Sequence, residues 1–480
     1  MHRGLLSATL AMIVGAAVPA AAAGQEYYRD IRPLLAQNCA DCHSDAGVAF
    51  SMEDPEATFR RRRAITEAVL DRRMPPWLGE PGHQQYIGER RLDATQIALI
   101  RSWAESGYQR GEPDPDAART WHRLVDGSHT AAFVPDLSLE VLPGGSYLPD
   151  QEAPDDYRCF IVPWPSERRT YVTGFRAVPG NRRVAHHVVV HAVDADMADR
   201  YRELDEAERG SGYQCFGGPV PDRLGERAER DAYEQRYPDG VRELDRGSFW
   251  LAHWAPGMDG HTFPEGTGIP LEPGSALVVQ MHYYSRHAPG ESDDASRIDF
   301  LVASQVDRPA FHLPQTRSAW LEADENGSMV VPPSGRATYE VSESLGDMLP
   351  YISRVTGVDE EHVAHLEVHS ANLHMHGFGH SGVIALTDAD GRKQTLLSVP
   401  RWDLAWQRDF TFVEPKIVPR GELDGTYLTV ECTFENPTKQ AVHGGYGSDE
   451  EMCFNFSYIA VQTAEKATQG PALRGRSSGS

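Results

Sequence analysis

The sequence predicts a multidomain protein in which a small all-α segment precedes a long region of β-strands. Its length of 480 residues exceeds that of a typical single domain, and 40% hydrophobic residues suffice for ordinary globular cores. Residues 24–112 carry apolar residues at helical spacing, whereas the chain beyond about residue 135 consists of short β-branched, apolar runs separated by Pro and Gly. Between them, residues 113–135 begin with acidic and Pro-rich sequence and are predicted to be an extended linker.

The N-terminus and the overall charge restrict the location and the partners of the protein. The net charge of −24 argues against nucleic acid and anionic membrane surfaces as partners. Residues 1–23 have a short basic start, an apolar stretch from Leu5 to Val18 and the run Ala21-Ala22-Ala23, as in a secretory signal peptide. We expect cleavage near Ala23 and a periplasmic or secreted protein without a membrane span, in a compartment where disulfides persist.

The first chemical motif is Cys39-Ala40-Asp41-Cys42-His43. Two thiols followed directly by an imidazole attach a c-type haem covalently and supply one axial ligand, His43. A thioredoxin-like pair or a zinc half-site are the alternatives. Neither has its usual context here, because no βαβ pattern surrounds the motif and no second Cys or His pair follows at zinc-finger spacing. The sequence therefore predicts one covalently bound haem c.

Helical signals surround the motif, as a small cytochrome requires. An apolar stripe at residues 31–35 leads into it, and residues 55–73 are predicted to form another helix. Asp93 and Gln96 form a predicted capping box at the start of a helix that Gly107 ends.

Met74 is the predicted second axial ligand of the haem. The helix over 55–73 stops at Met74-Pro75-Pro76-Trp77, and the prolines hold Met74 in an extended segment. His/Met ligation raises the haem potential. The alternative is that Met74 packs in the core and that Met52, or no side chain, is the ligand.

The β region contains His374-Met375-His376. If this run is a strand, alternation places both imidazoles on one face and Met375 on the other. The closest candidate third ligand of a suitable type is Met452. A His/His/Met set is soft enough to hold Cu(I) and leaves room for a small molecule. The alternative is a pair of surface histidines.

A second histidine group starts at His186 and His187. Neighbours on a strand point to opposite faces, so both can reach one metal only if the backbone bulges or the rings coordinate through different nitrogens. His282 is the candidate third ligand, and three histidines without a thioether suit a copper that stores one electron. Competitors without a partner at ligand spacing rank lower; they are His191, His253, His287 and His443.

Four further cysteines are available for disulfides: Cys159, Cys215, Cys432 and Cys453. Four cysteines allow three pairings, of which Cys159–Cys215 with Cys432–Cys453 is the most local and the most economical. The first bond would close a loop containing His186 and His187, and the second would restrain the residue next to Met452. Each would contribute roughly 3 to 4 kcal/mol by loop-closure entropy.

Residues 136–463 resemble the copper type II, ascorbate-dependent monooxygenases. The matching motifs, in chain order, are Tyr157-Arg158-Cys159, His186-His187, Pro264-Glu265-Gly266, Gln280-Met281-His282-Tyr283, His374-Met375-His376 and Glu450-Glu451-Met452-Cys453. Two features depart from the family pattern: the fused haem segment and an acidic, helix-permissive excursion at residues 194–246.

The resemblance implies two antiparallel β-sandwich (jelly-roll-like) domains, at residues 136–307 and 308–465, that face each other across a cleft. It assigns His186, His187 and His282 to an electron-storing copper. It assigns His374, His376 and Met452 to the copper that binds O2 and substrate. The family's disulfides match the local pairings. The Gly/Ser/Arg-rich tail, residues 466–480, is expected to be disordered.

These observations predict an exported, haem-containing copper monooxygenase that hydroxylates a C–H bond of a small organic substrate with O2. Two copper ions and one haem c are the expected cofactors, and a periplasmic electron donor is an expected partner. Each turnover requires two electrons, and one oxygen atom leaves as water. The alternative is a non-enzymatic periplasmic copper or electron carrier. A hydrolytic zinc enzyme is disfavoured by Met452.

Overall fold

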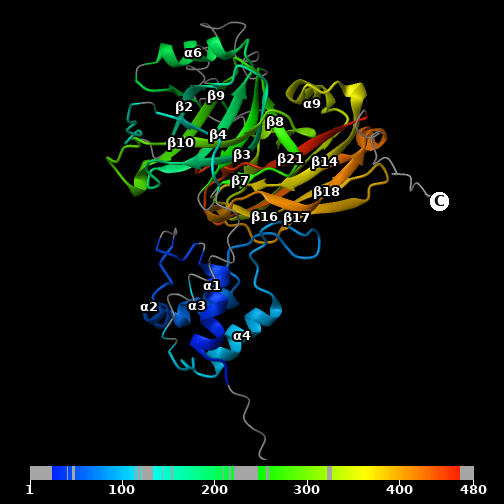
Figure 1. Ribbon diagram of the computed structural model, residues 1–480. Helices are drawn as coiled ribbons and strands as arrows, with labels where there is room; N and C mark the ends of the chain where they lie inside the picture. The colour runs from blue at the N-terminus through cyan, green and yellow to red at the C-terminus, as the bar shows by residue number, and fades with distance from the viewer. Residues whose placement is uncertain are drawn as a thin grey trace, which may run out of the picture. The chain divides into compact units, whose positions relative to one another are not determined.

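The computed structural model describes residues 24–464 except for residues 41, 46–48, 114, 116–120, 122–132, 143, 153–154, 209, 216–217, 221–246, 256–257, 259 and 322–326 (Figure 1). The predicted signal peptide and C-terminal tail therefore lie outside the described residues, as do most of the linker and the second half of the acidic excursion. The chain divides into two compact units. Unit 1 contains Met1–Pro76 and Arg90–Thr130, and unit 2 contains Trp77–Glu89 and Ala131–Ser480.

Unit 1 is helical in its described part. Its elements are η1 (Tyr27–Ile31), α1 (Arg32–Cys39), α2 (Pro55–Arg60), α3 (Arg62–Leu70) and α4 (Ala94–Glu105). The predicted capping box is present, because Asp93 accepts from the backbone of Gln96 at 2.8 Å and Gln96 accepts from the backbone of Asp93 at 2.9 Å. The helix expected over 55–73 is interrupted at Arg61, whose N–H bonds to Thr58 O in a tighter turn.

Unit 2 is built from β-sheets. Its N-terminal half contains β1 (Leu137–Glu140), β2 (Asp155–Pro163), β3 (Thr170–Val178), β4 (Ala185–Val193), α6 (Ala198–Ala207), β5 (Tyr213–Gln214), β6 (Ser248–Trp254), β7 (His261–Thr262), β8 (Thr267–Leu271), β9 (Ala276–Tyr284), η3 (Ser285–His287) and β10 (Arg297–Ala303). Strands β5-β2-β9-β4-β6 form one antiparallel sheet, whose β2, β9 and β4 lie side by side in Figure 1. The excursion that begins at residue 194 starts with α6.

The C-terminal half of unit 2 also consists mainly of β-strands, with a few short helices. They are β11 (Arg308–Gln315), η4 (Ser318–Trp320), β12 (Val330–Val331), β13 (Gly335–Ser344), α9 (Leu349–Thr356), η5 (Glu360–His362), β14 (Val363–Ala371), β15 (Leu373–His374), β16 (Gly379–Thr387), β17 (Lys393–Val399), η6 (Leu404–Trp406), β18 (Phe410–Pro419), η7 (Arg420–Gly425), β19 (Tyr427–Asn436), β20 (Val442–His443) and β21 (Phe454–Thr463). Strands β13-β19-β16-β17 form a four-stranded sheet, and β12 pairs with β20.

The two halves of unit 2 share one sheet. The ten-stranded sheet follows the path β1-β10-β3-β8-β11-β21-β14-β18, with β7 paired to β3 and β15 paired to β21 beside this path. Strand β8 meets β11 in a short parallel pairing of Thr267 with Arg308 and Gly268 with Pro309. In Figure 1, β8, β21 and β14 lie where the green half meets the yellow-to-red half. The expected boundary at 307/308 coincides with the start of β11. The two halves lie in one compact unit, and main-chain hydrogen bonds cross that boundary.

Residues 77–89 lie in a different unit from the one expected for them. They fall within the segment 24–112 expected to form the haem domain, but they pack in unit 2. Tyr86 forms an antiparallel bridge with Phe412, donates its hydroxyl to Leu396 O at 2.8 Å and is 4% exposed. An aromatic side chain of this size gains more from burial between β17 and β18 than from solvent.

Two disulfides lie in unit 2. Cys159 is joined to Cys215 and Cys432 to Cys453, which is the local pairing expected from the sequence. All four residues are fully buried. Buried disulfides are typical of proteins that fold outside the reducing cytosol.

Candidate metal centres

The first centre lies where β4 pairs with β9. His187 is directly opposite His282, and Ala185 is opposite Tyr283, so His186 is the extra residue of a β-bulge. The bulge turns His186 to the same side as its neighbour. This is the backbone irregularity that the sequence analysis required for adjacent histidines to share one metal.

Three imidazole nitrogens converge at this bulge. The Nδ1 atom of His282 lies 3.1 Å from that of His186 and 3.1 Å from that of His187, and the Nδ1 atoms of His186 and His187 are 3.4 Å apart. A neutral imidazole nitrogen either donates or accepts, so three mutually close Nδ1 atoms cannot all form favourable hydrogen bonds. One point lies about 1.9 Å from all three nitrogens, close to the ~2.0 Å of a metal–imidazole bond. The arrangement therefore fits a three-coordinate cation.

Neighbouring groups orient these rings. Asp155 Oδ1 accepts from His282 Nε2 at 2.8 Å, which places the imidazole proton on Nε2 and leaves the Nδ1 lone pair for a metal. The ring of Tyr157 stacks on His282 with centroids 4.0 Å apart. Burial and the adjacent imidazoles lower the pKa of both His187 and His282 well below the ordinary value. The rings are thus neutral at pH 7, the form that binds metal.

The second centre contains His374 and His376. Their ring centroids are 5.3 Å apart and the rings are nearly perpendicular, at 89°. The predicted strand is only partly present, since β15 ends at His374, where it pairs with Phe454 of β21. His376 lies in the irregular segment that follows, so the approach of the two rings depends on the end of a strand rather than on alternation along it.

Each ring of this pair has an acceptor on Nδ1. Gln407 Oε1 accepts from His374, and the backbone carbonyl of Glu450 accepts from His376 at 2.9 Å. Both rings therefore keep an unprotonated Nε2 for a metal. Burial, followed by the charge of His376, lowers the pKa of His374 to about 3, and burial also lowers the pKa of His376.

Glu451 connects His376 to Met452. Its fully buried carboxylate accepts from the backbone of His376 at 2.9 Å, of Met452 at 3.3 Å and of Phe378 at 2.5 Å. Burial raises the pKa of Glu451 to about 7, although these hydrogen bonds act to lower it. Sequence reasoning quoted Glu451 within a motif without assigning it a role. The sequence signal that could have identified it is an acidic residue directly before Met452, a candidate ligand with an apolar side chain.

One cavity of about 500 Å³ joins the two histidine groups. Its wall includes His186, His187, His374, His376 and Met452. The aromatic part of the wall is ordered by stacking. Trp250 and Phe456 lie 4.4 Å apart, and Phe454 and Phe456 lie 5.4 Å apart with an angle of 11° between their rings. Among the described residues that line the cavity there is no Lys or Arg, and Asp403 is the carboxylate.

The family comparison agrees with this arrangement. Residues 146–288 match the model of the copper type II ascorbate-dependent monooxygenase N-terminal domain, and residues 356–469 match that of the C-terminal domain. Together the two matches cover more than half of the chain. The chain belongs to the copper type II ascorbate-dependent monooxygenases. Residues 77–89 precede both matched regions of this monooxygenase, although they pack in the same unit.

Individual relatives are more distant. Dopamine beta-hydroxylase from Homo sapiens is 22% identical over 355 residues, which are 68% of this chain and 46% of the relative. The chain thus spans about half the length of that protein. Among solved structures, PNGF-II is 13% identical with a TM-score of 0.26, covering 78% of this chain and 70% of that chain. The bacteriophage PM2 capsid protein P2 is 11% identical with a TM-score of 0.25, covering 68% of this chain and 98% of that chain. Scores this low support no inference.

The lower-ranked histidines have separate positions in the monooxygenase unit. His191 and His253 line the cavity without belonging to either ligand set, and His443 is exposed in β20. The side chain of His287 lies outside the described part of the structure. Sequence reasoning did not identify Asn372, which lies in the cavity wall and donates to Asp409 at 3.0 Å.

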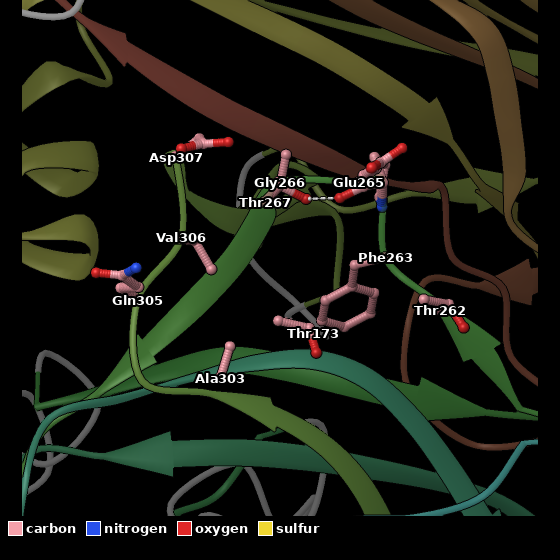
Figure 2. Close-up of a pocket in the computed structure, with 11 residues that line it drawn as sticks. Thr173, Thr262, Phe263, Glu265, Gly266, Thr267, Ala303, Gln305, Val306 and Asp307 are labelled. Carbon is pink, nitrogen blue, oxygen red and sulfur yellow. Dashed lines mark hydrogen bonds between the residues drawn. The ribbon is translucent and has the colours of Figure 1, made fainter.

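A second cavity of about 460 Å³ lies elsewhere in the monooxygenase unit (Figure 2). Its wall comes mainly from residues 262–267 and 303–307, with Glu265 and Asp307 as its carboxylates. Figure 2 shows the hydrogen bond from Thr267 Oγ1 to a carbonyl of the same turn. Its described lining contains no His, Cys or Met. None of the predicted metal ligands therefore lines this cavity.

The predicted haem ligands lie at the end of α1 in unit 1. Cys39 is the last residue of the helix, and the N–H of His43 bonds to Cys39 O at 2.9 Å. His43 Nδ1 donates to Phe50 O at 2.8 Å, which leaves Nε2 unprotonated in a ring that is 7% exposed. Within the described residues, Cys39 and Cys42 are not part of a disulfide. The donor set fits covalent haem attachment with His43 as axial ligand.

The two candidate methionines differ in their surroundings. Met52 is buried in the core of unit 1, and its carbonyl accepts from Thr58 Oγ1 at 2.9 Å. Met74 is half-buried and lies outside that core cluster. Met74 stays the predicted second axial ligand because the side chain of Met52 is packed in the core of unit 1.

Proposed function

We propose that this protein hydroxylates a C–H bond of a small organic substrate with O2, using two copper ions. The observation that carries the proposal is the single cavity whose wall contains His186 and His187 of one histidine group, both histidines of the other group, and Met452. Copper bound there supplies one-electron redox chemistry and activation of O2. A carrier that only holds or transports copper needs no aromatic substrate cavity between two different ligand sets.

The two ligand sets have different roles in this proposal. His186, His187 and His282 present three Nδ1 atoms and hold the electron-storing copper. His374 and His376 present Nε2, and with the Met452 thioether they hold the copper at which O2 and substrate react. A soft thioether favours Cu(I) and makes a zinc enzyme an unsuitable alternative.

The cavity wall indicates the type of substrate. Trp250, Phe454 and Phe456 offer stacked aromatic surface, and the described lining has no cationic side chain to bind a carboxylate. We therefore infer a substrate that is neutral or cationic and that inserts an apolar or aromatic group.

The test is product analysis with isotopically labelled O2. The copper-loaded protein is incubated with a reductant and a panel of aromatic, amine and peptide substrates. At least one product is expected to gain one labelled oxygen atom, with substrate-dependent O2 consumption. Redox cycling without O2 consumption, for every member of the panel, would favour the copper or electron carrier.

We also propose that unit 1 is a c-type cytochrome that supplies the electrons. Cys39 and Cys42 attach the haem, and His43 and Met74 are its axial ligands. A haem with both axial positions filled transfers electrons rather than binding O2. Because the donor is tethered, its effective concentration at unit 2, here called the copper unit, reaches roughly the millimolar range. A periplasmic partner then replenishes the haem, and small-molecule ascorbate becomes unnecessary.

Stopped-flow mixing tests this electron supply. Pre-reduced protein is mixed with O2 and substrate in the absence of ascorbate, and the haem absorbance is followed together with product. Haem oxidation is expected to match product formation. Cys42→Ala, which prevents normal haem attachment, is expected to lower turnover with protein donors and to spare turnover with excess ascorbate. A haem that stays reduced while product forms contradicts the electron supply.

We propose in addition that the protein is exported after cleavage near Ala23. Two buried disulfides support an oxidising compartment. No helix among the described residues is long and apolar enough to cross a membrane. N-terminal sequencing of the protein recovered from the periplasm and the medium tests the cleavage site.

A further inference from the structure

Residues 77–89, here called the strap, add a short piece of main chain to the C-terminal half of the copper unit. The backbone N–H of Glu80 bonds to Ser398 O at 2.7 Å, and that of Ile87 bonds to Thr411 O at 2.8 Å. These hydrogen bonds attach the strap to the ends of β17 and β18, so the strap is part of the copper unit although it interrupts the sequence of unit 1.

The first residue of the strap is held by ring contacts. The indole of Trp77 lies 5.1 Å from the ring of Phe410 in an edge-to-face arrangement, and the guanidinium carbon of Arg408 lies 5.0 Å from the indole centroid. Gly79 passes so close to Phe410 that a Cβ there would lie 3.0 Å from the phenyl ring. These contacts hold the strap against the segment that precedes and begins β18.

The segment under Trp77 also orients the second copper centre. Arg408 directly follows Gln407, whose side-chain oxygen accepts from His374 Nδ1. A route thus leads from Trp77 through the cation–π contact, the Arg408 side chain, one peptide bond, the Gln407 side chain and one hydrogen bond to His374. A second route runs from Phe410 through Asp409 to Asn372, which donates to Asp409 at 3.0 Å and lies two residues before His374.

At this same N-terminal end the strap directly follows the proposed haem-binding segment. Trp77 follows Met74, Pro75 and Pro76, and two consecutive prolines restrict the backbone between the two side chains. The proposed axial ligand of the haem is therefore covalently linked, through three peptide bonds, to a residue packed beside the partner of His374.

We propose that electrons from the haem enter the copper unit at the centre of His374, His376 and Met452, through Trp77 and residues 407–410, and not at the centre of His186, His187 and His282. The inference rests on the proposed electron supply by the haem. In the step, one electron leaves the haem, which changes from ferrous to ferric, and reduces Cu(II) to Cu(I). No bond is made or broken and no proton moves.

The experiment uses the full-length protein with haem and with both coppers as Cu(II), without O2. A flash-generated reductant reduces the haem, and the loss of ferrous absorbance reports electron transfer to copper. His282→Ala, which disrupts the three-histidine centre, is expected to leave this rate near the wild-type value. His374→Ala, which disrupts the other centre, is expected to slow it by at least about tenfold.

The possible results of this experiment distinguish failure of the proposed route from failure of the proposed electron supply by the haem. A ferrous haem that persists in the wild-type protein means that the haem does not supply the coppers, and the proposed electron supply fails. Rapid oxidation that His282→Ala abolishes and His374→Ala spares means that the supply holds and the route is wrong. Equal slowing by both variants also overturns the route. Electron paramagnetic resonance confirms which copper each variant retains.

A second set of variants tests Trp77 itself. Trp77→Ala in the His282→Ala protein is expected to slow haem oxidation about tenfold, whereas Trp77→Phe retains an aromatic ring over Arg408 and slows it less. Ile87→Ala is the matched control, since this strap side chain is 59% exposed and its backbone pairing is unchanged. Thermal melts verify that the strap variants are folded. An unchanged rate in folded Trp77→Ala overturns the role of Trp77.

Discussion

The carboxylate of Glu451 accepts a hydrogen bond from the backbone N–H of His376 at 2.9 Å, and the same oxygen accepts from the N–H of Met452 at 3.3 Å. Two chain segments separated by more than seventy residues, one with His376 and the other with Met452, are thus held by one buried carboxyl group. The carboxylate offers only acceptors, which matches the backbone donors that surround it. Glu451 is therefore a positioning residue for the centre.

Replacing Glu451 by Gln is expected to destabilise both the fold and the copper centre. The amide retains one acceptor but turns an NH2 group toward backbone N–H donors, which leaves buried donors without a partner at about 1–3 kcal/mol each. Denaturant unfolding measures the loss, and copper titration followed by electron paramagnetic resonance measures the affinity of the His374 centre. The exposed neighbour Asp449, changed to Asn, is the control. Equal behaviour of the two variants would exclude the positioning role.

Met452→Ala is expected to abolish hydroxylation while the copper of His186, His187 and His282 stays bound. The change removes the thioether and no imidazole, so one of two copper signals should alter. Metal analysis and X-ray absorption at the copper edge detect the loss of a sulfur ligand. Met258→Ala removes another thioether from the wall of the same cavity and serves as the control. Normal turnover by Met452→Ala would mean that the oxygen-reacting centre is misassigned.

Removing the bond between Cys432 and Cys453 with serines is expected to destabilise the protein by about 3 kcal/mol, because the bond closes a separation of 21 residues. Since Cys453 follows Met452, copper occupancy at that centre should also decrease. Removing Cys159–Cys215 is expected to cost about 4 kcal/mol for its separation of 56 residues. Calorimetry with metal analysis distinguishes the two. Loss of copper at the Met452 centre in both proteins would mean that proximity to Met452 is irrelevant.

Glu367 provides a pH-dependent contribution away from the copper ligands. Burial opposes its ionisation, but hydrogen bonds from His369 and His365 and the charge of Arg308 outweigh burial and lower its pKa to about 2. The unfolded carboxyl has a higher pKa, of 4.5, so the stabilisation is present above that pH and is lost as the pH falls toward 2.

Glu367→Gln is therefore expected to be less stable than wild type at neutral pH, with a difference that shrinks as the pH falls from 4.5 toward 2. Urea unfolding at a series of pH values measures this difference. Exposed Glu360, changed to Gln, is the control. A difference that does not vary over this interval would contradict the assignment of the low pKa to Glu367.

Gly79→Ala is expected to loosen the strap. The added Cβ would lie 3.0 Å from the ring of Phe410 and 3.3 Å from Leu397, and overpacking of this kind costs about 1–3 kcal/mol. Limited proteolysis should then cleave residues 77–89 more rapidly. Gly421→Ala adds a Cβ in open space and is the control. Equal cleavage of both variants would show that Gly79 tolerates a side chain.

Much of the site could be predicted because its signals are local. The proposed haem motif, the capping box of Asp93 and Gln96 and the ligand types at 374–376 are all contained in runs of a few residues. The bulge at His186 was a conditional prediction, because two adjacent imidazoles on a regular strand cannot point to one side. The disulfide pairing followed from economy of loop length and from the family resemblance.

Other features had no local signal. The strap was expected in the haem segment because its sequence neighbours are helical, but Trp77 and Tyr86 pack against strands more than three hundred residues later. The sheet shared by the two halves depends on the short β8–β11 pairing, which no local run of residues predicts. Asp155, Gln407 and Glu451 had no predicted role for the same reason.

The sequence alone determined which ligand atoms are available: three histidines in one set, two histidines and a thioether in the other, and two thiols beside an imidazole. Only the tertiary structure decided which nitrogen each ring presents. Asp155 places the proton of His282 on Nε2, whereas Gln407 places that of His374 on Nδ1. The physical reason is that side-chain identity is set by the covalent chain, while the tautomer of an imidazole is set by its hydrogen-bond partner, which another part of the chain brings to it.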